Sequence, residues 1–253
     1  MPPITGQNVL VIGGSAGIGL AVAKIASAEG ANVSIASSNL SRVQSAVLQI
    51  REAVPGARVM GYVCDVNHDD AESSLEKLFA DVNAAAGGQL LDHIVFTSGV
   101  LEIYPLNEMS MRTLRDCTQF KFVVPLLIGK LAPRYLKPSY KSSLTFTTGV
   151  LAEKPFKGTV VVSSVSSAMS GITKGLAVEL APIRVNAVSP GATDTDMLRA
   201  IPSMEERIPA ILERALLGKV GTAEEVAEAY IYLMKDSNST GSCVKSNGGG
   251  LLI

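Results

Sequence analysis

The feature that most constrains this chain is a short apolar segment, Asn8–Ile12, that runs directly into a glycine-rich stretch before a helical pattern begins. Glycines at 13, 17 and 19 permit a tight turn and a close approach of the backbone to a pyrophosphate. The helix that follows directs its N-terminus at that charge. This strand–turn–helix context favours a dinucleotide site over a turn without a ligand. The predicted contacts are Gly13, Ser15, Ala16, Gly17 and Ile18.

The rest of the chain alternates apolar runs with amphipathic stretches. This alternation is typical of βαβ units and indicates a parallel sheet with helices on its faces. The predicted strands are Asn8–Ile12, Asn32–Ala36, Arg58–Val63, Leu91–Thr97, Ser143–Thr148, Arg184–Val188 and Ser242–Ser246. The predicted helices are Gly17–Ala28, Asn39–Ala53, Asp69–Ala86, Ser110–Leu131, Val160–Leu180 and Ala223–Met234. The predicted fold class is α/β, a doubly wound parallel β-sheet of the Rossmann type, as a single domain over residues 1–253.

One segment, at about 195–217, interrupts the alternation of strands and helices. It contains Pro202 and Pro209 among scattered charges, and we expect it to form a helical lid over a substrate. Its recurring apolar side chains favour a bulky apolar small molecule as that substrate. Packing of an amphipathic lid explains the same side chains equally well.

Composition excludes several classes of function. The chain has 253 residues, of which 47% are hydrophobic, so it can bury a large core by itself. Its net charge is −1 with both signs interspersed, so we expect neither a nucleic-acid nor a membrane partner. No apolar run is long enough to span a bilayer, and residues 1–7 lack a basic and an apolar region, so we expect no signal peptide there. Three cysteines without CxxC spacing indicate thiols in a reducing, cytoplasmic compartment, and two histidines leave little for a metal site.

The end of the second predicted strand indicates which dinucleotide binds. An acidic residue there would hold the ribose 2′-hydroxyl of NAD and repel a 2′-phosphate. The chain instead carries small polar groups and then a cation: Ser37, Ser38, Asn39 and Arg42. This pattern favours NADP(H) over NAD. Asn39 also suits the N-cap of the next helix, and the two roles are compatible.

Several further motifs make the resemblance to a known family plain. The chain carries Cys64-Asp65-Val66, Thr97-Ser98-Gly99 and the run Ile183–Gly191 that ends Ser-Pro-Gly. With the glycine loop, these resemble the landmarks of the short-chain dehydrogenase/reductase superfamily over nearly the whole chain. The resemblance implies that Asp65 and Val66 hold the adenine and that Thr97, Ser98 and Gly99 lie beside the adenosine ribose. It also assigns the nicotinamide and its phosphate to Pro190, Gly191, Thr193 and Thr195. Each of these residues could instead only sustain a turn or the core.

The proton relay that this superfamily usually carries is missing. Members have a Ser at the end of the fifth strand and a Tyr-x-x-x-Lys pair on the next helix, where Lys lowers the pKa of the Tyr. No tyrosine in this chain is followed by a lysine four residues later. In the register that the resemblance gives, Val162 stands at the Tyr position and Ser166 at the Lys position. The Ser position falls within one residue of Thr148, and the helix-borne Asn of the family maps near Gln119.

Three functions are compatible with a bound hydride carrier and no relay. The protein can reduce a substrate that needs only hydride, such as an iminium or a polarised conjugated system. Its pocket can have changed to a non-redox step, such as cyclisation or isomerisation. It can also be a pseudoenzyme that binds NADP(H) as a scaffold or sensor.

A looser resemblance favours the first two of these functions. His93–Thr97, Pro125-Leu126-Leu127 followed by Lys130, and Ala229–Met234 are similar to atypical fungal reductases that also act as Diels–Alderases in prenylated indole alkaloid biosynthesis. Those secondary-metabolism enzymes also lack the Tyr and Lys, and they reduce an iminium. Lys121 stands about where they carry a basic residue. Their acidic residue after the fifth strand has no match here, because the register lands near Gly158.

Three residues are the predicted lining of the reaction site: Thr148, Gln119 and Lys121. Lys121 stands in an otherwise apolar run, and a half-buried cation needs a partner. That partner is either a substrate carbonyl or carboxylate, or a structural salt bridge. In the superfamily the helices at Ser110–Leu131 and Val160–Leu180 commonly form a dimer core, and both are apolar here, so we expect a homodimer or homotetramer.

Overall fold

A computed structural model describes residues 1–101, 103 and 105–253. Seven parallel strands form one sheet in the order β3-β2-β1-β4-β5-β6-β9. They are β1 (Asn8–Ile12), β2 (Asn32–Ser37), β3 (Arg58–Val63), β4 (His93–Phe96), β5 (Ser143–Thr147), β6 (Arg184–Pro190) and β9 (Cys243–Ser246). The strand order reverses between β1 and β4, which is where doubly wound sheets bind ligands. The predicted α/β Rossmann fold is confirmed.

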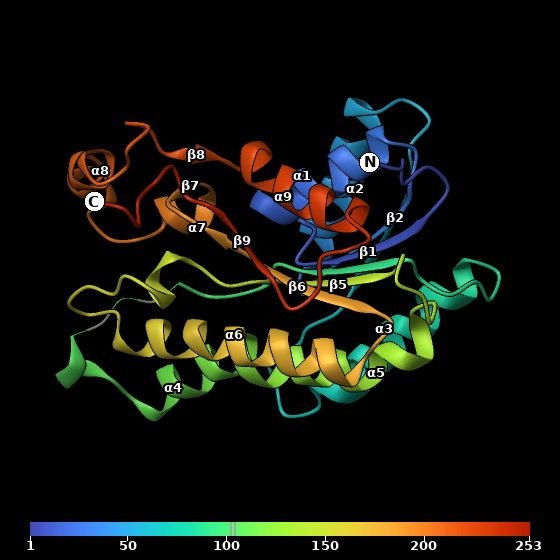
Figure 1. The fold of residues 1–253 in the computed structure, drawn as a ribbon, viewed down its shortest axis with the longest axis horizontal. Coiled ribbons are helices and arrows are strands. Elements are labelled where there is room, and N and C mark those ends of the chain that lie inside the picture. The colour runs from blue at the N-terminus through green and yellow to red at the C-terminus, as the bar shows by residue number, and fades with distance from the viewer. Residues whose placement is uncertain (102, 104) are drawn as a thin grey trace.

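Helices cover both faces of this sheet (Figure 1). Above it in the figure lie α1 (Gly17–Ala28), α2 (Leu40–Ala53) and α9 (Ala223–Lys235). Below it lie α3 (Ala71–Ala85), α4 (Met111–Thr118), α5 (Val124–Tyr135) and α6 (Val160–Glu179). Each face has its own apolar core, one built around Phe79, Phe96 and Phe146 and the other around Val11, Ile35 and Tyr230. Within the described residues, no helix has the length and apolarity that crossing a bilayer requires.

The helix predicted at Ser110–Leu131 is not continuous. The π-helical turn η2 (Gln119–Val123) separates α4 from α5. Pro125 stands at the start of α5 and has no N–H, so it cannot donate the helical hydrogen bond to the carbonyl four residues earlier. The π-helical turn therefore comes at the point where a regular α-helix would lose a bond, and such turns are frequent at functional sites.

The segment that interrupts the alternation contains short elements. They are β7 (Thr193–Asp194), α7 (Asp196–Arg199) and α8 (Met204–Glu213), followed by β8 (Gly221–Thr222), which pairs with β7. Two further short helices are η1 (Leu106–Glu108) and η3 (Val150–Ala152). The segment is helical as predicted, and its role as a lid stays a prediction.

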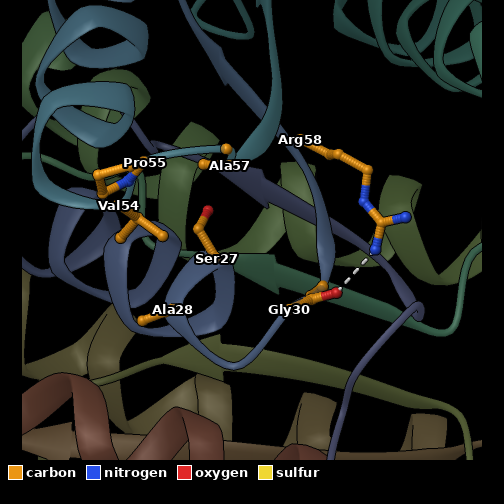
Figure 2. A pocket seen from close by; sticks show the side chains of 9 residues that line it. Ser27, Ala28, Gly30, Val54, Pro55, Ala57 and Arg58 are labelled. Carbon is orange, nitrogen blue, oxygen red and sulfur yellow. Dashed lines mark hydrogen bonds between the residues drawn. The ribbon is translucent and has the colours of Figure 1, made fainter.

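A surface hollow of about 430 Å³ lies at the opposite end of the sheet from the glycine loop. It lies between the C-terminal ends of α1 and α2 and the turns that lead from these helices into β2 and β3 (Figure 2). Arg58 reaches along its edge and donates to the Gly30 carbonyl at 3.1 Å. Because parallel sheets bind ligands at the carboxyl ends of their strands, this hollow is not part of the candidate site.

Candidate cofactor and substrate site

The glycine loop has the geometry that a close turn requires. Gly13 has φ of +94°, which favours glycine, and a Cβ there would lie 2.6 Å from both Ser98 N and Thr97 Oγ1. A Cβ on Gly19 would overlap the Gly13 carbonyl oxygen. The absence of these side chains lets the loop pack against the end of β4. The predicted residues of the loop and of Thr97–Gly99 are therefore brought together.

The N-terminus of α1 is open to an anion. Its N-cap, Ala16, supplies no side-chain acceptor, whereas Asn39, Ser110 and Thr222 cap α2, α4 and α9 with their side chains. The first amide groups of a helix need acceptors, and a pyrophosphate supplies them. A Cβ on Gly17 would lie 3.1 Å from Thr195 Cγ2, so the chain after β7 adjoins this loop. The cradle fits the phosphates of a dinucleotide.

The end of β2 presents the polar groups that the sequence indicates. Ser37 is half-buried, and Ser38, Asn39 and Arg42 are exposed. Asn39 Oδ1 accepts from Arg42 N at 3.0 Å and from Ser41 Oγ at 2.7 Å, so its capping role is confirmed. The Arg42 guanidinium has neither an ion pair nor a hydrogen bond to the described part of the chain. It is therefore available to a phosphate.

The two ends of the predicted cofactor cleft are defined by loops. Asp65 is exposed and its Oδ1 accepts from Asn67 N, while Val66 is buried. At the other end, Gly191 N donates to Ser246 O at 2.9 Å, and a Cβ on Gly191 would lie 2.8 Å from Asn247 Cα. Pro190 is buried and is the last residue of β6. The Thr193 hydroxyl donates to the Gly191 carbonyl. The side chain of Thr195 caps the N-terminus of α7.

Lys121 lies at the carboxyl ends of β4 and β5. Its Nζ donates to the main-chain carbonyl of Thr147 at 2.9 Å, and a Cβ on Gly99 would lie 3.7 Å from that Nζ. Burial lowers the pKa of the Lys121 ammonium to about 8. No carboxylate of the described chain pairs with it, so the structural salt bridge that the sequence left open is not formed.

Thr148 and Gln119 differ from Lys121 in how they are engaged. The Thr148 hydroxyl donates to the main-chain carbonyl of Ser166 on α6 at 2.8 Å. The Gln119 side chain donates to the carbonyls of Val66 and His68, on the loop after β3. The structure therefore places Lys121, two residues further along η2, at the strand ends and turns Gln119 toward the loop after β3, where the sequence predicts the adenine contacts.

The helix α6 contains no acid or base at the relay positions. Val162 and Ser166 are 4% and 3% exposed, so both lie on its buried face. A Cβ on Gly149 would meet only Pro190 O, at 3.9 Å, so the start of the β5–α6 loop leaves open space beside β6. Sequence reasoning missed this position because a glycine in a loop carries no chemical signal of its own.

Two charged residues of the β5–α6 loop, Glu153 and Lys154, are tied to the C-terminal segment. Glu153 pairs with Lys245 at 2.6 Å, and Lys154 Nζ donates to Gly250 O at 3.2 Å. Among the described residues, no group of three or more His, Cys, Asp or Glu side chains could hold a metal ion. His93 is buried between Gln7 and Ser143, and burial lowers its pKa to about 3.

Comparison with known proteins places this geometry in a family. The sequence family described as an SDR-like Rossmann domain matches residues 3–253. The chain belongs to the short-chain dehydrogenase/reductase (SDR) family. It is 48% identical to the short-chain dehydrogenase/reductase ATR9 of Stachybotrys chlorohalonatus, with all of both chains covered. It is 36% identical to the short-chain dehydrogenase/reductase malC of Malbranchea aurantiaca, over 98% of this chain and 96% of that one.

Solved SDR structures superpose on nearly the whole chain. The MalC reductase/Diels–Alderase of Malbranchea aurantiaca matches with a TM-score of 0.92 at 35% identity, over 99% of this chain and 97% of that one. A short-chain dehydrogenase of Burkholderia cenocepacia J2315, solved in complex with NADP, matches with a TM-score of 0.88 at 27% identity, over 98% and 99% of the two chains. The predicted membership of the superfamily and the predicted likeness to fungal reductase/Diels–Alderases are confirmed.

Proposed function

We propose that this SDR is an NADPH-dependent reductase that delivers hydride to an iminium or a polarised conjugated substrate. The observation that carries the proposal is the replacement of the acid–base pair on α6 by two buried residues, Val162 and Ser166. The cradle at Gly13–Ile18, the Ser37–Arg42 edge and the loops at Asp65, Thr97 and Pro190–Thr195 support NADP(H) as the cofactor. A substrate that is already electrophilic needs no general acid from the protein.

The chemistry of the substrate explains why a relay is dispensable. When bound, the nicotinamide supplies a hydride. Its addition to an iminium carbon forms a C–H bond, the π electrons of the C=N⁺ bond pass to nitrogen, and a neutral amine results without a proton. A ketone instead gives an alkoxide that must be protonated, and general acid help there is worth about 10²–10⁴-fold.

Lys121 supports the conjugated-carbonyl form of the proposal. An ammonium has three N–H donors, and the structure uses one of them on Thr147 O. A remaining donor can hydrogen-bond a substrate carbonyl and stabilise the negative charge that develops on its oxygen as hydride arrives. The protein thereby polarises the acceptor without a Tyr.

We also propose that the substrate is bulky and apolar and that α7 and α8 cover it. Large apolar side chains are exposed on the segments that lead into and out of the strand ends: Met109, Met111, Phe156, Met197, Leu216 and Leu217. An apolar substrate would bury these side chains and exclude water from the reaction. The open space at Gly149 supports room for such a substrate beside β6.

The deciding experiment compares three substrates with NADPH in one assay. An N-alkylated cyclic iminium, a conjugated enone and a simple ketone of similar size are incubated with the protein, and NADPH absorbance is followed. We expect turnover of the iminium or the enone and none of the ketone above the rate without protein. Brisk turnover of the ketone would contradict the proposal, because it would require a relay that α6 lacks.

A second candidate function is a cyclisation that follows or replaces reduction. It is favoured by the likeness to a reductase/Diels–Alderase at 35% identity over nearly the whole chain. Its test is a diene–dienophile substrate incubated without NADPH, with the ratio of product stereoisomers compared with and without protein. An altered ratio supports a cyclase. If NADPH binds tightly while no substrate is reduced or cyclised, the scaffold function takes precedence.

A further inference from the structure

The side chain of Gln119 joins two parts of the molecule that are far apart in the sequence. Its Nε2 donates to Val66 O at 2.8 Å and to His68 O at 3.1 Å, 53 and 51 residues away. A primary amide nitrogen has two N–H donors, so both are used on this one loop. The loop is the one that carries Asp65 and Val66, the expected adenine contacts.

Apart from Val66, which is buried in the core, the loop at residues 65–70 has few polar contacts that hold it to the rest of the molecule. Its other side-chain hydrogen bonds are local, such as Asn67 N to Asp65 Oδ1 and Asp70 N to His68 Nδ1. Most of its residues are exposed. Among the described residues, Gln119 supplies the long-range side-chain hydrogen bonds of the loop. Through these two hydrogen bonds, a movement of the loop displaces Gln119 and with it η2.

The same π-helical turn also carries Lys121. Residues two apart on a helix face different sides, so Gln119 and Lys121 reach out of η2 in different directions. Gln119 holds the loop after β3, and Lys121 holds the Thr147 carbonyl at the end of β5. The turn is thus fixed from two sides by side chains that begin two residues apart.

We propose that Gln119 is a positioning residue that couples occupancy of the adenosine half of the cofactor cleft to the position of the Lys121 ammonium. A ligand on Asp65 and Val66 orders the loop, and the loop holds Gln119 and with it η2. A better-fixed η2 keeps Lys121 on Thr147 O, ready for the substrate. Such a coupling is a free energy shared between two sites, and it acts without contact between the adenosine and Lys121. The inference rests on the proposed NADP(H) site.

The test measures the exposure of the Lys121 amine directly, without turnover. The full chain is treated with cyanate at a pH near 8, with and without saturating 2′,5′-ADP, and carbamylation of Lys121 is followed by peptide mass spectrometry. Cyanate reacts with neutral amines, so a lysine whose pKa is about 8 is labelled ahead of ordinary lysines. We expect 2′,5′-ADP to slow labelling of Lys121 by about fivefold or more, the lower end of usual coupling.

Three variants decide the origin of that protection. Gln119→Met keeps the length of the side chain and removes its donors, and Gln119→Glu presents an acceptor to the two carbonyls. Both should still bind 2′,5′-ADP by calorimetry but lose the protection of Lys121. Gln49→Met, on the exposed face of α2, is the matched control and should keep it.

The possible outcomes separate this inference from the proposed function. If 2′,5′-ADP binds the wild type and protects Lys121 equally in Gln119→Met and Gln119→Glu, the coupling is disproved and the cofactor proposal stands. Binding without protection of the wild type disproves the coupling as well. If 2′,5′-ADP fails to bind the wild type, the NADP(H) proposal falls and the coupling falls with it.

Discussion

The Thr148 hydroxyl donates its proton to the main-chain carbonyl of Ser166, 2.8 Å away, and thereby links the end of β5 to the middle of α6. In the register that the resemblance to the SDR superfamily gives, Ser166 stands at the position of the relay Lys. The single O–H donor of the hydroxyl is therefore used within the protein. Its oxygen lone pairs can still accept a hydrogen bond from a substrate or face a positive charge on it. A lone pair stabilises a positive charge, which suits an iminium better than a ketone oxygen.

This relationship predicts how Thr148 variants behave. Thr148→Val should lower kcat/KM for an iminium by roughly fivefold, because one acceptor worth about 1 kcal/mol is lost. Thr148→Ser keeps the hydroxyl and should stay within about twofold of the wild type. Steady-state kinetics with the N-alkylated iminium measures both. Equal loss in the two variants would show that packing rather than the hydroxyl matters.

The lowered pKa of Lys121 predicts opposite pH profiles for two substrate classes. Below a pH of about 8 the ammonium is charged, and above it the amine is neutral. Reduction of an enone that needs the ammonium should therefore fall as the pH rises through 8. The rate of reduction of a fixed-charge iminium should rise over the same range, because deprotonation of Lys121 removes a positive charge that repels the iminium.

The Lys121→Met variant is the control for these profiles. It should remove the inflection near pH 8 from both profiles, while NADPH affinity measured by calorimetry stays close to that of the wild type. An inflection that survives in Lys121→Met would assign the titration to another group. Profiles with the same sign for both substrates would disprove the electrostatic role of Lys121.

The residues after β2 predict the preference for NADPH. NADPH should bind at least about tenfold more tightly than NADH, or about 1.4 kcal/mol, because Ser37 and Arg42 can hold a 2′-phosphate. Arg42→Ala should remove most of that difference, and Ser37→Asp should reverse it by repelling the phosphate. Calorimetric titration with both cofactors measures it. Arg112→Ala, on the exposed side of α4, is the matched control and should change neither affinity.

The outer face of α4, α5 and α6 predicts self-association. Leu126 on α5 and Val178 on α6 expose large apolar surfaces on this layer, which lies below the sheet in Figure 1. We propose that this layer is the interface of a homodimer or homotetramer. Light scattering should give a particle at least twice the 26.4 kDa chain mass. Leu126→Glu should lower the particle mass toward that of the monomer, whereas Leu48→Glu on α2 should leave it unchanged. A wild type that is monomeric at micromolar concentration would reject the interface.

Much of this protein was determined by its sequence alone. The glycine loop, the alternation of strands and helices and the missing acid–base pair are local patterns, and each follows from residues within one or two elements. The Rossmann fold and the SDR family could therefore be predicted before the structure. So could the capping role of Asn39, because an N-cap bonds only three residues along its own chain.

The arrangement of the predicted reaction site was decided by tertiary structure. Gln119 and Lys121 are two residues apart, and the sequence predicts the same site for both. Residues two apart on a helix face different sides, and the packing of η2 against the sheet decides what each side chain meets: Gln119 reaches the loop after β3 and Lys121 the end of β5. The low pKa of Lys121 likewise depends on its burial beside Gly99 and Thr147, at the ends of β4 and β5. Lys121 is more than twenty positions from Gly99 and from Thr147. Local sequence patterns do not show which distant residues will bury a side chain, so this pKa could not be predicted from the sequence.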